Sequence, residues 1–228
     1  MARMRPDAVQ PIRICFVDGT GATTEVTSLP ILKNRRKLNH EGWNRDESIR
    51  KFLWYLSRCD VEGFEASADA LIRLNCLGDA LKSCLKGQRP NKGKLEILLH
   101  FWNVRGLWSI PRALKEDLCL FTDAVRYFAP PYVGDGLTLY RGQSRTRHEN
   151  GIYGIAWTSR YEIAEQQFAG LRDSPGIVVK VDASPDMIVA HVPDYIQTPK
   201  TNPASELDFE DEYLLDPRKL VGRVSVVC

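Results

Sequence analysis

The chain has 228 residues, and its 43% hydrophobic and 26% charged residues are the proportions of a folded globular protein rather than of a disordered or fibrous one. Its 31 Lys and Arg residues nearly balance 29 Asp and Glu residues, so the net charge of +2 argues against a general polyanion binder. No apolar run approaches the roughly 18–20 residues of a membrane-spanning helix, and the N-terminus lacks the apolar core of an export signal. We therefore expect a cytoplasmic protein with no membrane partner.

The N-terminal segment predicts a β-hairpin. Residues 10–17 alternate between apolar and polar as a strand does, and a turn at 18–21 precedes a second strand-like run at 23–28. The basic run Lys33–Lys37 follows. We interpret this run as a solvated surface, with a contact to nucleic acid as the alternative.

From about residue 46 the apolar residues recur with the 3.6-residue period of a helix, and this pattern continues to about residue 129. We interpret these stripes as core and expect no chemistry from them. They consist of Ile49, Phe52, Leu53 and Leu56; of Leu71, Leu74, Leu81 and Leu85; of Leu95, Leu98, Leu99 and Trp102; and of Leu114, Leu118, Phe121, Val125 and Phe128.

After the turn at 134–136 the sequence changes to short β-rich runs separated by Gly, Pro, Asn and Asp. The runs are 137–141, 177–181, 188–192, 212–215 and 221–227. Helices followed by strands predict an α+β fold. We expect a single domain over residues 1–228, with a helical half at about 46–129 and a mixed or antiparallel β half at about 134–228.

The six cysteines and four histidines are scattered through the chain. None of them shows the short ligand spacing of a zinc site, and no Cys-x-x-Cys pair is present. We therefore expect reduced thiols and no metal.

Two short motifs in the β half carry residues suited to chemistry. Arg141 ends the first β-rich run and is followed by Gly142. A guanidinium there can bind a phosphate through several donors, while glycine lets a ligand approach the backbone. The second motif, Trp157-Thr158-Ser159, leads into a short helix. By itself it fits a buried Trp157 and a Ser159 that caps the helix.

The third motif is acidic. Six of the eleven residues from Glu206 to Asp216 are acidic and none is basic. Glu210 and Glu212 are two residues apart, so on an extended segment both side chains point to the same face. The residue pattern of a calcium loop is absent. A pair of carboxylates leading directly into an apolar strand indicates a site rather than a solvated tail.

In this order the three motifs resemble the Arg–Ser–Glu clade of mono-ADP-ribosyltransferases, the cholera-toxin-like group. The similar segments are Leu139–Gly142, Trp157–Ala169 and Glu210–Leu215, and the resemblance covers only residues 137–227. Trp157 stands where the family commonly has the first serine of Ser-Thr-Ser. The resemblance implies a β core of the ADP-ribosyltransferase type, with two packed sheets.

The resemblance also implies a reaction. Such enzymes use NAD⁺ as co-substrate without a metal and cleave its glycosidic bond through an oxocarbenium-like transition state, which a carboxylate stabilises. It assigns charge stabilisation and ribose binding to Glu212, the acceptor to Glu210, and the diphosphate to Arg141. It further assigns the nicotinamide amide to the backbone of Gly142, the orientation of Glu212 to Ser159, packing on the nicotinamide ring to Trp157 or Phe168, and a place in the NAD⁺ site to Thr158.

The function expected from this resemblance is that of a toxin or effector acting in the cytoplasm of its own or of a target cell. It would modify a macromolecular acceptor, either a protein side chain such as Arg or a nucleic-acid base, and a cognate antitoxin or immunity protein is an expected partner. The alternatives are an NAD⁺ glycohydrolase and a degenerate binding module of the same fold. Contacts to nucleic acid through Lys33–Lys37, Arg145 and Arg147 could coexist with transfer to a base.

Overall fold

The computed structural model describes residues 14–17, 23–26, 42–87, 89–106, 109–166, 176–196 and 211–227. It divides the chain into two units, Met1–Leu38 and Asn39–Cys228. The first unit contains strands β1 (Ile14–Val17) and β2 (Thr23–Val26), which pair antiparallel and confirm the predicted hairpin. The basic run Lys33–Lys37 lies outside the described residues. Both predicted halves lie in the second unit.

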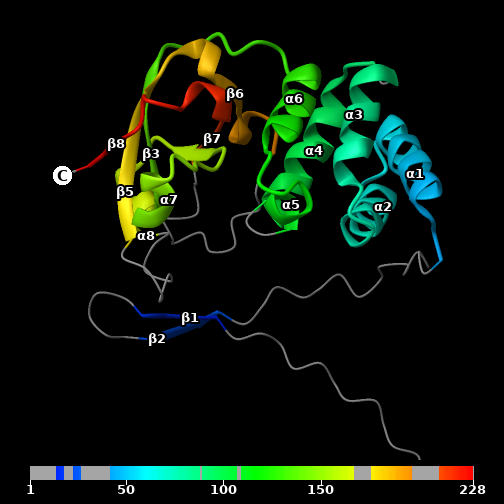
Figure 1. Cartoon of the computed structure of the whole chain (residues 1–228), viewed down its shortest axis with the longest axis horizontal. Coiled ribbons are helices and arrows are strands. Elements are labelled where there is room, and N and C mark those ends of the chain that lie inside the picture. Colours follow the sequence, from blue (N-terminus) through cyan, green and yellow to red (C-terminus); the bar gives the residue numbers. More distant parts are fainter. Residues whose placement is uncertain are drawn as a thin grey trace, which may run out of the picture. The chain divides into compact units, whose positions relative to one another are not determined.

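In the helical half of the second unit, three long helices each begin after a residue whose side chain caps the helix. Asn44, Asp60 and Asn91 each accept a hydrogen bond from a backbone N–H of the first helical turn. The helices are α1 (Arg45–Arg58), α2 (Val61–Arg73), α3 (Leu77–Gly87), α4 (Lys92–Arg105), α5 (Ser109–Ala113) and α6 (Cys119–Phe128). They pack beside one another on one side of the sheet (Figure 1).

The apolar stripes of these helices form one buried cluster, as the sequence predicted, with two differences. The stripe through residues 64–86 is divided between α2 and α3. The break follows α2, where Asn75 adopts a left-handed backbone conformation with a φ of 52°. Leu74, at the end of α2, is 42% exposed and does not belong to the core.

The strands of the second unit form one six-stranded sheet in which every pair is antiparallel, with the order β6-β7-β4-β3-β5-β8. This confirms the α+β class. The strands are β3 (Leu137–Ser144), β4 (Ala156–Thr158), β5 (Gly176–Ala183), β6 (Ile188–His191), β7 (Glu212–Leu215) and β8 (Ser225–Val226), and helices α7 (Arg145–Glu149) and α8 (Tyr161–Gln166) lie between them in the chain.

The centre of this sheet is weakly paired. Strands β3 and β5 pair over eight residues, whereas β3 and β4 share only the pair Tyr140 and Thr158. The sheet therefore consists of two parts, β6-β7-β4 and β3-β5-β8, that meet at one residue pair. The two packed sheets expected from the sequence are not found among the described residues, which place both parts in one hydrogen-bonded sheet.

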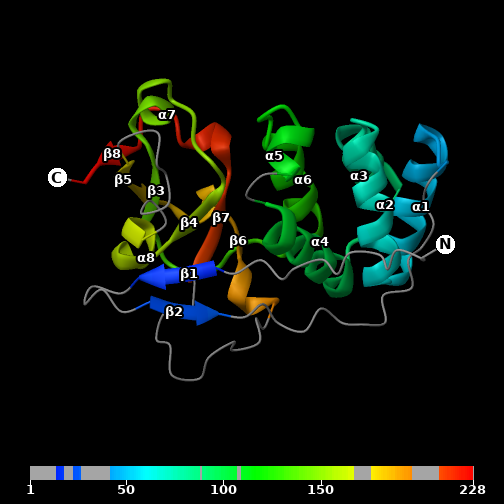
Figure 2. The ribbon, with the colours of Figure 1, turned by 90° about the horizontal axis from the view of Figure 1, so that it is seen from below.

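The two faces of the sheet have different environments. Ala190, Leu214 and Ile155 belong to the same buried cluster as the helices. Trp157, Tyr213 and residues of β3 and β5 form a second cluster on the other face. Figure 2 shows β6 and β7 as the strands next to α4 and α6. Because Glu212 is two residues before Leu214 on β7, its side chain shares the face that the helices cover.

None of the helices in the described segments is long and apolar enough to cross a lipid bilayer.

Candidate active site

The structure places the three sequence motifs on neighbouring central strands. Arg141 lies on β3, Ser159 directly follows β4, and Glu212 begins β7. Thr158 pairs with Tyr140 on one side and with Glu212 on the other. Directly opposed residues share one face of a sheet, so the side chains of Tyr140, Thr158 and Glu212 form a row across β3, β4 and β7. Thr158 is thus the residue of the second motif that lies opposite Glu212.

Glu212 is held by a residue that the sequence analysis assigned only to the core. The indole Nε1 of Trp102, on α4, donates a hydrogen bond of 2.7 Å to Oε1 of Glu212. Trp102 is only 6% exposed, and its ring packs against Phe121 with the centroids 5.2 Å apart. A buried indole N–H needs an acceptor, and this requirement was the one signal in the sequence that Trp102 contacts a polar group.

Arg141 lies where β3 and β4 are not paired. Its Nη1 donates to the backbone carbonyl of Ala156 over 2.5 Å. Its Nε is buried and has no hydrogen-bond partner among the described residues. The residue as a whole retains intermediate exposure, whereas protein atoms enclose its guanidinium.

The charge of Arg141 is affected by this enclosure. Burial and the nearby charge of Arg147 lower its pKa, and the charge of Glu212 raises it in part, so that the pKa is about 10. Successive side chains of a strand point to opposite faces of the sheet, so the side chains of Arg141 and Tyr140 lie on opposite faces of β3. The guanidinium nevertheless comes close enough to Glu212 for the two charges to interact.

Two of the predicted binding residues are buried. Gly142 lies inside β3. Trp157 is 2% exposed, donates its indole N–H to the carbonyl of Gly154 at 3.0 Å, and packs in the second core cluster. The structure therefore places Trp157 in the core, on the face opposite Glu212. This position agrees with the interpretation of Trp157 as a buried core residue.

Ser159 makes a different contact from the one expected. Its hydroxyl donates a short hydrogen bond to Oδ2 of Asp211, the residue before Glu212. The resemblance assigned to this serine the orientation of Glu212 itself. Successive residues of an extended chain point to opposite sides, so a serine bonded to Asp211 holds the segment that carries Glu212 rather than the Glu212 carboxylate.

Asp211 is the middle of a longer chain of contacts that the sequence analysis missed. Its Oδ1 faces Nε2 of His191 at 2.6 Å, and Nδ1 of His191 faces Oδ1 of Asp194 at 2.9 Å. The imidazole also stacks on Tyr213, with ring centroids 4.4 Å apart. Each of the two ring nitrogens of His191 thus faces a carboxylate oxygen. Only the pairing of β6 with β7 brings His191 here, and the sequence gives no sign of that pairing.

Two predicted site residues, Glu210 and Phe168, lie outside the described residues. In the described segments no cluster of three or more His, Cys, Asp or Glu side chains could hold a metal ion.

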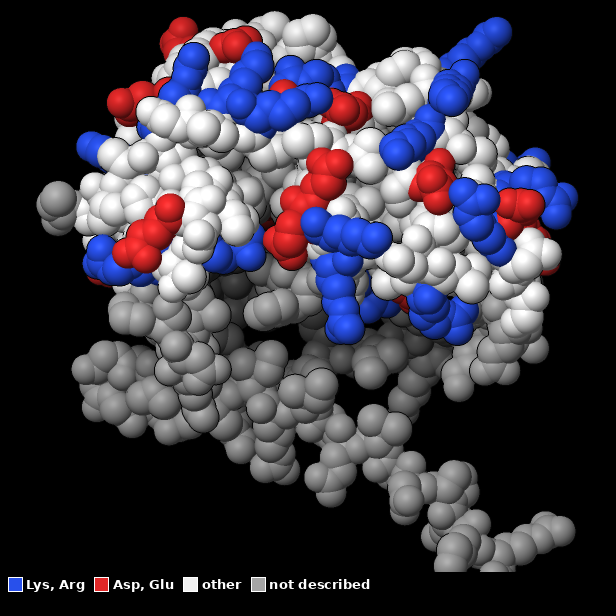
Figure 3. Space-filling model, in the orientation of Figure 1, with Lys and Arg blue, Asp and Glu red and all other residues white. Residues whose placement is uncertain are grey.

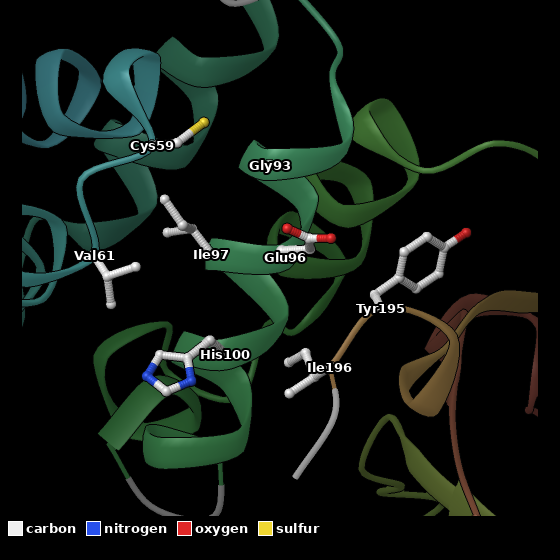
Figure 4. A pocket seen from close by; sticks show the side chains of 8 residues that line it. All are labelled: Cys59, Val61, Gly93, Glu96, Ile97, His100, Tyr195 and Ile196. Carbon is white, nitrogen blue, oxygen red and sulfur yellow. The ribbon is translucent and has the colours of Figure 1, made fainter. Parts of the chain in front are cut away.

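A pocket of about 280 Å³ lies elsewhere, on the helical half (Figure 4). It contains none of the motif residues, because it is formed between α4, the start of α2 and the turn that follows β6. Its lining residues are Cys59, Val61, Gly93, Glu96, Ile97, His100, Tyr195 and Ile196.

Basic and acidic side chains are intermixed on the face of the molecule seen in Figure 3. Arg147, a candidate contact to nucleic acid, is paired with Glu116 at 3.1 Å.

Comparison with protein-family models, curated proteins and solved structures finds no match to this chain. The interpretation of the site therefore rests on the motifs and on their geometry.

Proposed function

We propose that this protein is an NAD⁺-dependent mono-ADP-ribosyltransferase that acts as a toxin or effector in a cytoplasm. The proposal includes a β core of the ADP-ribosyltransferase type and a macromolecular acceptor, with a cognate antitoxin or immunity protein as partner. One observation carries it: an enclosed arginine, whose Nε has no hydrogen-bond partner in the described part of the chain, lies close enough to interact with the charge of a glutamate on the neighbouring part of the sheet.

The environment of Arg141 fits a diphosphate. An enclosed donor without an acceptor costs about 1–3 kcal/mol, and phosphate oxygens are strong acceptors for a guanidinium. A bound diphosphate would also neutralise the positive charge of the Arg141 guanidinium, whose pKa is lowered by burial. Nη1 is already engaged by the Ala156 carbonyl, which fixes the direction in which the remaining donors point.

Glu212 is suited to the chemical step. When the bond between the ribose C1′ and the nicotinamide nitrogen breaks, its electron pair leaves with nicotinamide and positive charge develops on the ribose. A fixed carboxylate beside that charge lowers the barrier, as in glycosidases. The acceptor then forms the new bond to C1′ and loses a proton. By the resemblance, Glu210 meets this acceptor.

The test uses the full chain, NAD⁺ labelled in its adenylate phosphate, and a whole-cell lysate. Release of nicotinamide together with a labelled macromolecule supports the transferase, and digestion with protease or nuclease identifies the acceptor class. Release of nicotinamide with free labelled ADP-ribose alone identifies a glycohydrolase. Absence of nicotinamide release, with the protein shown to be folded, contradicts the proposal.

Two variants control this experiment. Glu212→Gln removes the charge that faces the ribose, so nicotinamide release should fall at least about 10²-fold. Glu62→Gln changes an exposed carboxylate in the first turn of α2 and should leave the rate unchanged.

A further inference from the structure

The side chain of Trp102 joins the helical half to the candidate active site. Trp102 and Glu212 are 110 residues apart in the chain, and the 2.7 Å bond between Nε1 and Oε1 joins α4 to β7. Hydrogen bonds with one ionised partner are shorter and stronger than neutral ones, and this contact is as short as that class. The contact therefore involves more than the filling of space between two layers.

Trp102 has little freedom to move from this position. Its ring lies against Phe121 on α6. Its indole also occupies the space beside Gly106, where an added Cβ would lie 2.7 Å from Cδ2 and Cε2. The helix that carries it is anchored by Leu95, Leu98 and Leu99, all completely buried. A donor fixed in this way can hold its acceptor in one orientation.

Glu212, in contrast, depends on outside support. A glutamate side chain has three rotatable bonds, and it loses conformational freedom when its carboxylate is fixed. Thr158 flanks Glu212 on the neighbouring strand, and Leu214 follows it on the same face. Preorganised groups stabilise a developing charge more effectively than mobile ones, because no reorganisation is needed during the reaction.

From these contacts we propose that Trp102 is a positioning residue for Glu212, so that the helical half is part of the active site and not only its support. The inference rests on the proposed function, because it assigns Glu212 to the chemical step. Trp102 acts through the glutamate and does not touch the substrate.

The first experiment compares Trp102→Phe with the unchanged protein in nicotinamide release. Phenylalanine keeps an aromatic ring beside Phe121 but lacks the N–H. We expect kcat to fall about 10- to 100-fold, as for other groups that orient a functional residue, with KM changed by less than about threefold. Trp54→Phe is the matched control, since Trp54 is 49% exposed on α1 and should tolerate the same exchange. An unchanged kcat in folded Trp102→Phe would overturn the proposal.

The second experiment does not need activity or a stable Trp102 variant. The five tryptophans give five indole N–H signals in a ¹⁵N-resolved NMR spectrum of the whole protein. Glu212→Gln should shift the Trp102 signal and leave that of Trp54 in place. A Trp102 signal that does not move would show that the contact is absent and would overturn the inference.

The two experiments separate this inference from the proposed function. If Glu212→Gln retains nicotinamide release, the assigned role of Glu212 is wrong, and the inference fails with it even if the indole signal moves. If Glu212→Gln loses release and Trp102→Phe does not, the proposed function stands and only the role of Trp102 is wrong.

Discussion

The guanidinium of Arg141 occupies the space that a side chain at Gly154 would need. An ideal Cβ at Gly154 would lie 2.5 Å from Nη2 and 2.6 Å from Cζ of Arg141. Two residues further along, the carbonyl of Ala156 accepts from Nη1 of the same arginine. A side chain at residue 154 would therefore displace the guanidinium from this position.

Gly154→Ala should therefore reduce NAD⁺ binding without a change at any group that touches NAD⁺. The added methyl displaces the guanidinium, and we expect the affinity to fall by about 1–3 kcal/mol, the range for a hydrogen bond to a charged group. Calorimetric titration measures this loss. The control is Gly87→Ala, where an added Cβ meets nothing within 4 Å. Equal affinities for the Gly154→Ala variant and the unchanged protein would mean that Arg141 does not bind the ligand from this position.

Arg141→Lys keeps the charge but loses the planar set of donors. The affinity for NAD⁺ should again fall by about 1–3 kcal/mol, because one ammonium cannot contact both the Ala156 carbonyl and a diphosphate as the guanidinium does. The same titration measures the effect. An unchanged dissociation constant would assign Arg141 a structural role only.

The pH dependence of binding should report Arg141 directly. Burial lowers its pKa to about 10, so NAD⁺ affinity should be complete below that pH and be lost as the pH rises through it. Folding responds in the opposite direction. In the unfolded chain the pKa of Arg141 has its higher ordinary value and the proton is held more tightly, so the contribution of Arg141 to the free energy of unfolding grows as the pH rises above about 10. Titrations at several pH values, with melting curves to confirm folding, check both signs.

Ser159→Asp should abolish most NAD⁺ cleavage while the melting temperature stays near that of the unchanged protein. The new carboxylate would face Asp211, and two carboxylates in contact repel each other. The double variant Ser159→Asp with Asp211→Asn should recover part of the rate, because an amide can donate to the introduced carboxylate. If the double variant is no better than Ser159→Asp alone, the contact between residues 159 and 211 is not what activity requires.

His191→Phe keeps an aromatic ring to stack on Tyr213 but removes both contacts to carboxylates. Asp211 then loses the contact to His191, and we expect NAD⁺ cleavage to fall about 10-fold or more, as for other residues that orient a site. His100→Phe, in the helical half, is the comparison. A fully active His191→Phe variant would show that the contact to His191 is not needed to hold Asp211.

The sequence allowed the helices and most of the strands to be predicted, because their apolar periods and turn residues are local signals. The contacts of the site are not local. Whether Ser159 meets Asp211 or Glu212 depends on a register difference of one residue between β4 and β7, and such a shift reverses which side chains share a face. The bond from Trp102 to Glu212 depends on which face of β7 the helices cover, and no pattern within either segment specifies that.

The position of β7 in the sheet determines when the site can exist. This strand lies between β4 and β6, and both of them, together with β3 and Trp102, precede it in the chain. During synthesis on the ribosome, Arg141 and Trp102 are therefore made before β7, when the position between β4 and β6 is not yet filled. Contacts between such distant residues form late in folding. A nascent chain that has not yet reached residue 212 lacks the carboxylate and with it the proposed activity. The proposed activity therefore requires that a strand made later enters between two strands that were made before it.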